Sequence, residues 1–253
     1  MHAQPPRARL GYWHDGFVAL LHRNSKKSTE LDLNKGAFAG TSMTLANRLM
    51  DVGIDGKGRF DSADHVAQRA LQESGGDVDA AIEKVIADHR RLAAAGGFVT
   101  GLGGFVTMTV SLPANIAGFY TLATRMTAAI AHLRGYDLRN PDLRSAILLA
   151  LVGGEADALL KKAGVVSTGR LANLATRGLP PAARMVIDKA VGFRLIAQVS
   201  EKLLPRLGKS IPFAGGVVGA GLDVYLLNKV AKTARIQFPV ARPGSPGTAS
   251  ASA

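Results

Sequence analysis

Apolar positions dominate one long stretch of the chain, residues 92–124, in which none of the 33 side chains is Lys, Arg, Asp, Glu or His. The segment before this stretch has a helical pattern. One stripe of mainly apolar positions recurs at steps of three or four residues, with charged side chains between them: Val78, Ile82, Val85, His89 and Leu92. This spacing is typical of an amphipathic helix. We expect the helix to start after Asp77 and to lead directly into the apolar stretch.

The apolar stretch divides near Pro113 into two pieces of different character. The first piece is rich in glycine, and Gly97, Gly101 and Gly104 would let a helix approach its neighbours closely. Pro113 suits the first turn of a second helix, which we expect to run to about residue 134.

Arg125 lies in the middle of this second predicted helix. A charged side chain is costly at the centre of a bilayer, and a membrane span needs about 20 apolar residues with few charges. Bulky side chains fall on one face of the helix, whereas small and polar ones, Arg125 among them, fall on the other. We therefore predict a buried or interfacial helical hairpin in preference to two transmembrane spans.

Further helices are expected on both sides of the central hairpin. Capping residues, prolines and glycines mark their ends, and the Gly-rich loop 52–62 should end the helix before it. The last helix opens with Gly215 and Gly219, which echo the glycine-rich entry of the central stretch. The predicted fold class is all-α: a bundle of about eight to ten helices with the two Gly-rich segments packed centrally. Besides the two central helices, we expect helices at about residues 12–22, 35–49, 62–74, 141–152, 155–163, 180–204 and 215–238.

The chain should form one main domain with additions at both ends. We expect a disordered N-terminus at 1–10, an N-terminal helical extension at 11–76, the main helical domain at 77–238 and a disordered tail at 239–253. The tail consists mainly of Pro, Gly, Ser and Ala, a composition that cannot bury a core. The first residues lack the apolar core of a signal peptide, so we expect no secretion. The absence of Cys excludes disulfides and thiolate sites.

The net charge is +12, and most of it follows the apolar stretch. Residues 134–209 carry 13 basic and 6 acidic side chains, and residues 210–253 carry 4 and 1, so these two segments hold ten of the twelve excess charges. Such a surface suits an anionic membrane, where each Lys or Arg near the surface contributes about 1 kcal/mol. Nucleic acid is the competing partner, but the chain shows no zinc-finger spacing and no dense Lys/Arg cluster. A basic surface that only keeps the protein soluble is the simplest alternative.

No pattern in the sequence indicates a catalytic site, a cofactor or a metal. The six histidines form no paired metal motif, and no Ser lies in a Gly-x-Ser-x-Gly motif. Polar groups in apolar surroundings are more informative, because buried charges need partners. We expect Arg125 to pair with Asp223 or Asp188 and so to link the two Gly-rich regions. The candidate packing or interaction residues are Gly97, Gly101, Gly104, Pro113, Arg125, Gly215, Gly219 and Asp223.

Three segments in a fixed order carry a family resemblance. They are GGFVTGLGGFVTMTVSLPANIAGFYTLATRMTAAIAHLRGYDL, then LLALVGGEADALLKKAG, then IPFAGGVVGAGLDVYLLNKVAKTAR. Over about residues 80–238 the chain resembles the EcsC protein family. The resemblance implies a bacterial, helical protein with an accessory role near the membrane, linked to an ABC transporter or to secretion, and no defined reaction.

Three functional hypotheses follow. The first is a non-enzymatic, membrane-associated accessory protein, cytoplasmic and peripheral at the inner face of the cell membrane, whose partner is the membrane surface or a membrane protein. The second is a soluble carrier that encloses an apolar or lipid-like ligand. The third is an enzyme whose chemistry no motif reveals.

Overall fold

The computed structural model describes residues 35–57, 60–102, 104–166, 169–207 and 214–241, with the backbone alone for 35–39, 97–116, 198–207 and 214–219. The regular elements in these ranges are helices, which confirms the all-α fold class. The predicted helix 12–22, the N-terminal residues 1–10 and the tail from 242 lie outside the described residues. The elements are α2 (Lys35–Arg48), the π-helix η1 (Leu49–Ile54), α3 (Ala63–Glu73), α4 (Val78–Leu102), α5 (Gly104–Leu133), α6 (Pro141–Val152), the short 3₁₀ turn η2 (Gly153–Glu155), α7 (Ala156–Lys162), the 3₁₀ helix η3 (Leu171–Thr176), α8 (Pro181–Leu207) and α9 (Ala214–Gln237).

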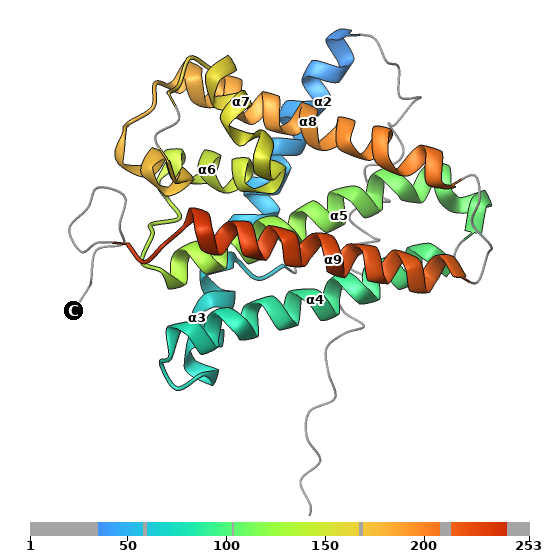
Figure 1. Cartoon of the computed structure of the whole chain (residues 1–253), viewed down its shortest axis with the longest axis horizontal. Coiled ribbons are helices and arrows are strands. Elements are labelled where there is room, and N and C mark those ends of the chain that lie inside the picture. Colours follow the sequence, from blue (N-terminus) through green and yellow to red (C-terminus); the bar gives the residue numbers. More distant parts are fainter. Residues whose placement is uncertain (1–34, 58–59, 103, 167–168, 208–213, 242–253) are drawn as a thin grey trace, which may run out of the picture.

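Helix α5 is the centre of the fold. It packs against η1, α3, α4, α6 and α9. Figure 1 shows α4, α5 and α9 running alongside one another, with α3 on one side of this group and α6, α7 and α8 on the other. Residues 123–131 of α5 are all buried, so the bulky face and the small face predicted for this helix both meet protein.

The buried hydroxyl groups of α5 are satisfied within the helix itself. Thr121, Thr124 and Thr127 each donate to the carbonyl four residues earlier, at 2.7, 2.7 and 2.8 Å. A buried polar group without a partner would cost free energy, so this arrangement lets α5 carry threonines through the core.

Capping residues set several helix boundaries as the sequence predicts. Ser62 precedes α3 and accepts the backbone N–H of His65, and Asp77 precedes α4 and accepts that of Ala80 at 3.0 Å. Asn140 precedes the Pro141 that opens α6, and its side chain accepts two backbone N–H groups. These bonds satisfy donors that would otherwise be orphaned at a helix start.

The predicted division of the apolar stretch at Pro113 is wrong. One helix, α4, continues to Leu102, and the next begins at Gly104 and passes through Pro113 without a break. A proline inside a helix removes one backbone hydrogen bond and its ring crowds the carbonyl four residues earlier, at a cost of about 3 kcal/mol. Here the sequence stays apolar on both sides of Pro113. The boundary between the two helices lies between Leu102 and Gly104 instead. The chain does form a helical hairpin, because α4 and α5 pack against each other, but its two arms differ from the predicted ones.

The Gly-rich loop also starts later than predicted. Gly53, expected to break the preceding helix, lies within η1. A Cβ added to Gly53 would lie 2.8 Å from the Cβ of Thr124, so this glycine allows η1 to approach α5 closely. The chain leaves the helix after Ile54, and Gly56 has the positive φ of +70° that only glycine adopts readily.

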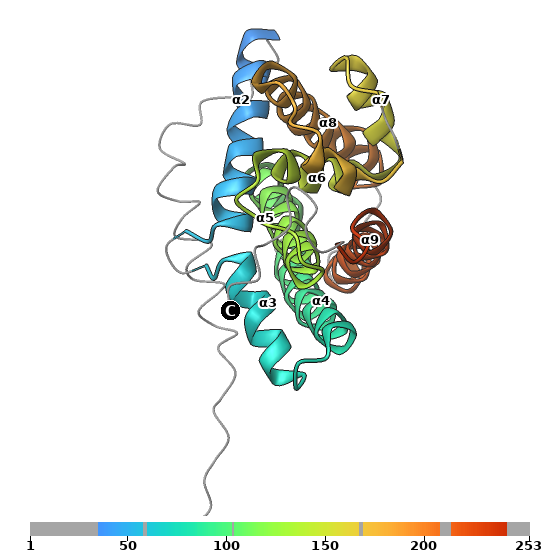
Figure 2. The ribbon, with the colours of Figure 1, turned by 90° about the vertical axis from the view of Figure 1, so that its left-hand side faces the viewer.

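Helix α2 packs against α8 and stands upright beside it in the view of Figure 2. Gly192 of α8 forms the contact, because a Cβ at that position would lie only 2.0 Å from the carbonyl oxygen of Ser42. The segment before the central hairpin is therefore packed into the fold, with α2 on α8 and α3 on α5. None of the described helices combines the length and the apolar character that a bilayer span requires.

Candidate functional site

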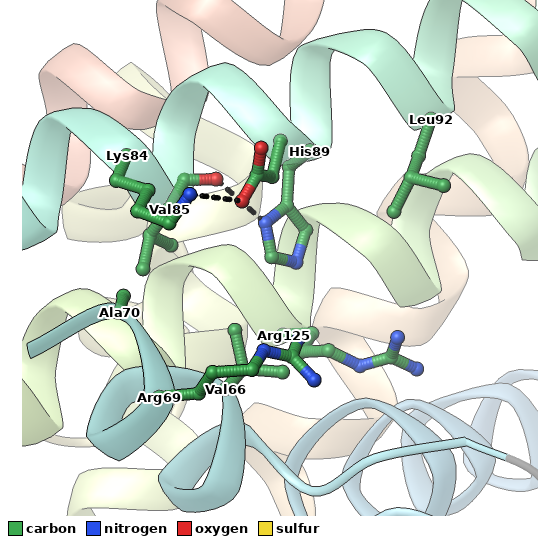
Figure 3. A pocket seen from close by; sticks show the side chains of 9 residues that line it. Val66, Arg69, Ala70, Lys84, Val85, His89, Leu92 and Arg125 are labelled. Carbon is green, nitrogen blue, oxygen red and sulfur yellow. Dashed lines mark hydrogen bonds and ion pairs between the residues drawn. The ribbon is translucent and has the colours of Figure 1, made fainter. Parts of the chain in front are cut away.

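A small pocket lies where α3, α4 and α5 meet (Figure 3). The helical spacing of α4 brings Val85, His89 and Leu92 to the same side, where they meet one turn of α3 and a single side chain of α5. The pocket has a volume of about 40 Å³, room for about three water molecules at roughly 10–15 Å³ each. It is lined by Val66, Arg69 and Ala70 of α3, Lys84, Val85, Asp88, His89 and Leu92 of α4, and Arg125 of α5.

His89 is buried in the wall of this pocket, with 3% of its surface exposed. Its Nδ1 atom lies 2.8 Å from the carbonyl oxygen of Val85. Burial, and after it the positive charges of Arg125 and Arg69, lower the pKa of His89 to about 4. The imidazole is therefore neutral at pH 7.

Arg125 is buried more completely, with 1% of its surface exposed. Its guanidinium donates to the carbonyl oxygen of Val52 at 3.5 Å and lies over the ring of Phe60, with 5.4 Å between Cζ and the ring centroid. Burial lowers the pKa of Arg125 to about 10, and the carboxylate of Asp61 partly offsets that effect. The group is still charged at neutral pH, so the protein holds a cation in its core.

The predicted pairing of Arg125 with Asp223 or Asp188 is wrong. Asp188 accepts a hydrogen bond from Ser145 at 2.8 Å, and burial alone shifts the pKa of Asp223. Among the described residues, the carboxylate whose charge acts on Arg125 is that of Asp61. Sequence reasoning took α5 and α9 as the two helices that this charge would link. The structure instead turns Arg125 toward η1 and the loop before α3, because that side of α5 faces these segments.

The charged side chains at the mouth of the pocket are partly exposed and paired with one another. Arg69 lies 3.1 Å from Asp61, and Lys84 lies 2.8 Å from Glu73 and 3.7 Å from Asp88. Exposed pairs of this kind contribute little to stability, at most about 1 kcal/mol each. They keep the mouth polar and open to solvent.

The other predicted interaction residues do not join this pocket. Gly97 and Gly101 belong to α4, Gly104 and Pro113 belong to α5, and Gly215 and Gly219 belong to α9. Only the backbone is described at these six positions, so the predicted close packing of the glycines stays a prediction. Asp223, further along α9, is largely buried, and burial raises its pKa to about 6.

The raised pKa of Asp223 predicts a pH-dependent effect of Asp223→Asn. An aspartate in the unfolded chain titrates near pH 3.9, so between about pH 4 and pH 6 the folded state binds more protons and loses stability as the pH rises. The neutral asparagine avoids this loss. We expect the variant to be more stable than the parent by on the order of 2 kcal/mol at pH 8 and equally stable at pH 3. Urea denaturation at the two pH values measures the difference, and an equal effect at both would contradict it.

Sequence reasoning missed the pocket, although one signal pointed to it. His89 occupies an apolar position in the predicted stripe of α4, where a polar ring is out of place. Arg69 and Lys84 resemble ordinary surface residues in the sequence, and only the packing of α3 on α4 brings them beside that ring. Within the described residues, no group of three His, Asp or Glu side chains is arranged to hold a metal ion.

Comparison with known families identifies the chain. The family model described as the EcsC protein family matches residues 26–240. The chain belongs to the EcsC protein family. The match includes α2, η1 and α3, which precede the motifs that carry the resemblance. This agrees with the packing of α2 on α8 and of η1 and α3 on α5. No curated protein and no solved structure matches the chain.

Proposed function

We propose that this EcsC-family protein is a non-enzymatic accessory protein that binds peripherally to an anionic membrane surface, at the cytoplasmic face of the cell membrane. The observation that carries the proposal is the outer face of α8. Met185, Val186 and Phe193 are 58%, 42% and 52% exposed there, although large apolar side chains are normally buried.

The two faces of α8 differ in the way expected of an interfacial helix. Ile187, Val191 and Leu195 are fully buried and anchor the helix to the protein. At 100° per residue, Met185, Val186 and Phe193 fall on a single outward arc together with the exposed Lys189. An apolar arc with a lysine that can reach the headgroups is the pattern of a helix that lies in the membrane interface.

Helix α9 carries a second surface of the same kind. Tyr225 and Ile236 are 64% and 53% exposed, and the exposed Lys229 and Lys232 lie between them on the same arc. Lysines near an anionic surface each contribute about 1 kcal/mol. The excess of basic residues from 134 onward therefore supports binding to anionic rather than neutral lipid. A role beside transport or secretion machinery comes from the family resemblance alone.

A carrier of an apolar ligand receives less support. A pocket that encloses a drug-sized or lipid-like ligand typically measures about 300–1,000 Å³. The pocket between α3, α4 and α5 is far smaller, and its lining includes the charged side chains of Arg69, Lys84, Asp88 and Arg125. We therefore favour surface binding over enclosure of a lipid.

Flotation with vesicles tests the proposal. We expect the protein to float with vesicles containing phosphatidylglycerol and to stay behind with pure phosphatidylcholine. The double variant Met185→Asp/Phe193→Asp no longer moves two half-exposed apolar side chains from water into the membrane interface, which lowers the binding free energy by about 2 kcal/mol. It also adds two negative charges that the anionic lipid repels. The partition constant should fall about 30-fold or more.

Val78→Asp provides the matched control, because Val78 is an exposed apolar residue on α4, away from α8. It should bind like the parent. No flotation with anionic vesicles at low salt would refute the proposal, as would equal loss in the control and the double variant.

A further inference from the structure

The pocket between α3, α4 and α5 presents a buried hydrogen-bond acceptor. A backbone carbonyl can only accept, so the short contact with Val85 places the proton of neutral His89 on Nδ1. Nε2 then carries a lone pair. This atom is buried, has no hydrogen-bond partner among the described residues, and points toward the side of the pocket where Arg69 and Arg125 lie (Figure 3). A buried acceptor of this kind is costly unless an occupant of the pocket donates to it.

Four lining residues are apolar, and three of the others offer donors and positive charge. Arg69, Lys84 and Arg125 line the pocket from three different helices. Asp88 is the one carboxylate in the lining, and its charge is offset by Lys84 and by Arg91 at 2.9 Å. The charges that act on His89 itself, those of Arg125 and Arg69, are both positive. A suitable occupant therefore has anionic oxygens on one side and a hydroxyl donor on the other.

We infer that this pocket binds a protonated phosphate group, either as inorganic phosphate or as the end of a phosphomonoester. The P–OH of the group donates to Nε2 of His89, and its charged oxygens accept from the guanidinium groups of Arg125 and Arg69. Guanidinium groups form strong charge-assisted bonds with phosphate oxygens. The inference does not depend on membrane binding, because no residue of α8 lines the pocket.

The size of the pocket fits the same group. Space for about three water-sized atoms accommodates three of the four phosphate oxygens. The fourth then lies at the mouth, beside the partly exposed side chains of Lys84 and Asp88. In a phosphomonoester this outer oxygen carries the ester, so the rest of such a ligand would project into solvent.

The lone pair of His89 also predicts selectivity. Inorganic phosphate retains a hydroxyl group at neutral pH, whereas sulfate is fully deprotonated and offers acceptors only. Sulfate would therefore place an oxygen against the buried lone pair of Nε2, with no hydrogen between them. The pocket should prefer phosphate to sulfate although both are tetrahedral oxyanions.

Nitrogen NMR of the histidine side chains provides the test. Protein labelled with ¹⁵N at histidine is titrated at pH 7 with inorganic phosphate and, at matched ionic strength, with sulfate. The His89 signal is identified by its absence in His89→Gln. We expect its Nε2 resonance to shift saturably with phosphate and to respond at least tenfold more weakly to sulfate.

Two arginine variants distinguish phosphate binding in the pocket from a general attraction of anions to a positively charged surface. Arg69 is 47% exposed at its side chain, so Arg69→Gln should fold normally and raise the dissociation constant for phosphate about tenfold. Arg90→Gln removes the same charge from an exposed position next to His89 in the sequence. This variant should change the dissociation constant for phosphate less than twofold. Equal effects of the two variants, or equal responses to phosphate and sulfate, would overturn the inference.

A second titration distinguishes the source of the phosphate group. Dioctanoyl phosphatidic acid, kept below its micelle concentration, carries the phosphomonoester of a lipid headgroup. Saturation by inorganic phosphate alone assigns the pocket to the free ion, and tighter binding of the phosphatidic acid assigns it to a headgroup. No saturable shift with either compound would show that only water occupies the pocket. Met185→Asp/Phe193→Asp should leave phosphate binding unchanged, so the result is independent of membrane binding.

Discussion

Gly192→Ala is expected to destabilise the protein by about 3 kcal/mol. The new Cβ would lie 2.0 Å from the carbonyl oxygen of Ser42 and 2.7 Å from its carbonyl carbon. Both are backbone atoms, so no side-chain rotation relieves the clash, and α2 has to move away from α8. Overpacking of this kind typically costs 1–3 kcal/mol and occasionally more. Urea denaturation followed by circular dichroism measures the change.

Gly221→Ala is the matched control for this prediction. Gly221 lies in α9, and an added Cβ would meet no atom within 4 Å. Alanine restricts the unfolded chain and favours the helix, so this variant should gain about 0.5–1 kcal/mol. Two variants of equal stability would show that the α2 and α8 backbones are not in contact at Gly192.

Arg125→Ala is expected to destabilise the protein by a similar amount, about 3 kcal/mol. The substitution empties a fully buried site in α5 and leaves the carbonyl oxygen of Val52 and the ring of Phe60 without their contact. Truncation of a large buried side chain to alanine costs about 2–5 kcal/mol. The same denaturation experiment gives the value.

Arg125→Met separates the volume of this side chain from its charge. Methionine fills most of the space and removes a cation whose desolvation opposes folding, and such replacements are often neutral or stabilising. We expect stability within about 1 kcal/mol of the parent, together with loss of the phosphate response of His89. A Met variant as unstable as the Ala variant would mean that the charge of Arg125 is required for folding.

Much of the fold follows from local signals in the sequence. Asn140 and Pro141 mark the start of α6 because an amide that caps backbone N–H groups and a ring that needs no N–H both suit a helix start. Ser62 and Asp77 act in the same way for α3 and α4. Each of these features depends on residues only a few positions apart in the chain, so the local sequence is enough to predict it.

Features set by contacts between distant segments were not predictable in this way. Gly53 and Gly192 look like helix breakers or neutral positions in the sequence, yet each lies where one backbone approaches another helix. Pro113 looks like a helix start and lies within α5 instead. The pocket has one feature that the local sequence shows and others that only the packing of distant helices sets. The position of His89 on an apolar stripe was visible, but its neighbours Arg69 and Arg125 come from helices whose packing no local pattern specifies.

The central claim is that the outer face of α8 enters the membrane interface, and fluorescence quenching tests it most directly. The chain has a single tryptophan, Trp13. A Trp13→Phe/Phe193→Trp variant places one reporter on this face, and Trp13→Phe/Val78→Trp places it on α4. With anionic vesicles that contain brominated lipid, we predict strong quenching of the reporter at position 193 and none at position 78. Vesicle-bound protein whose reporter at position 193 stays unquenched would contradict the account.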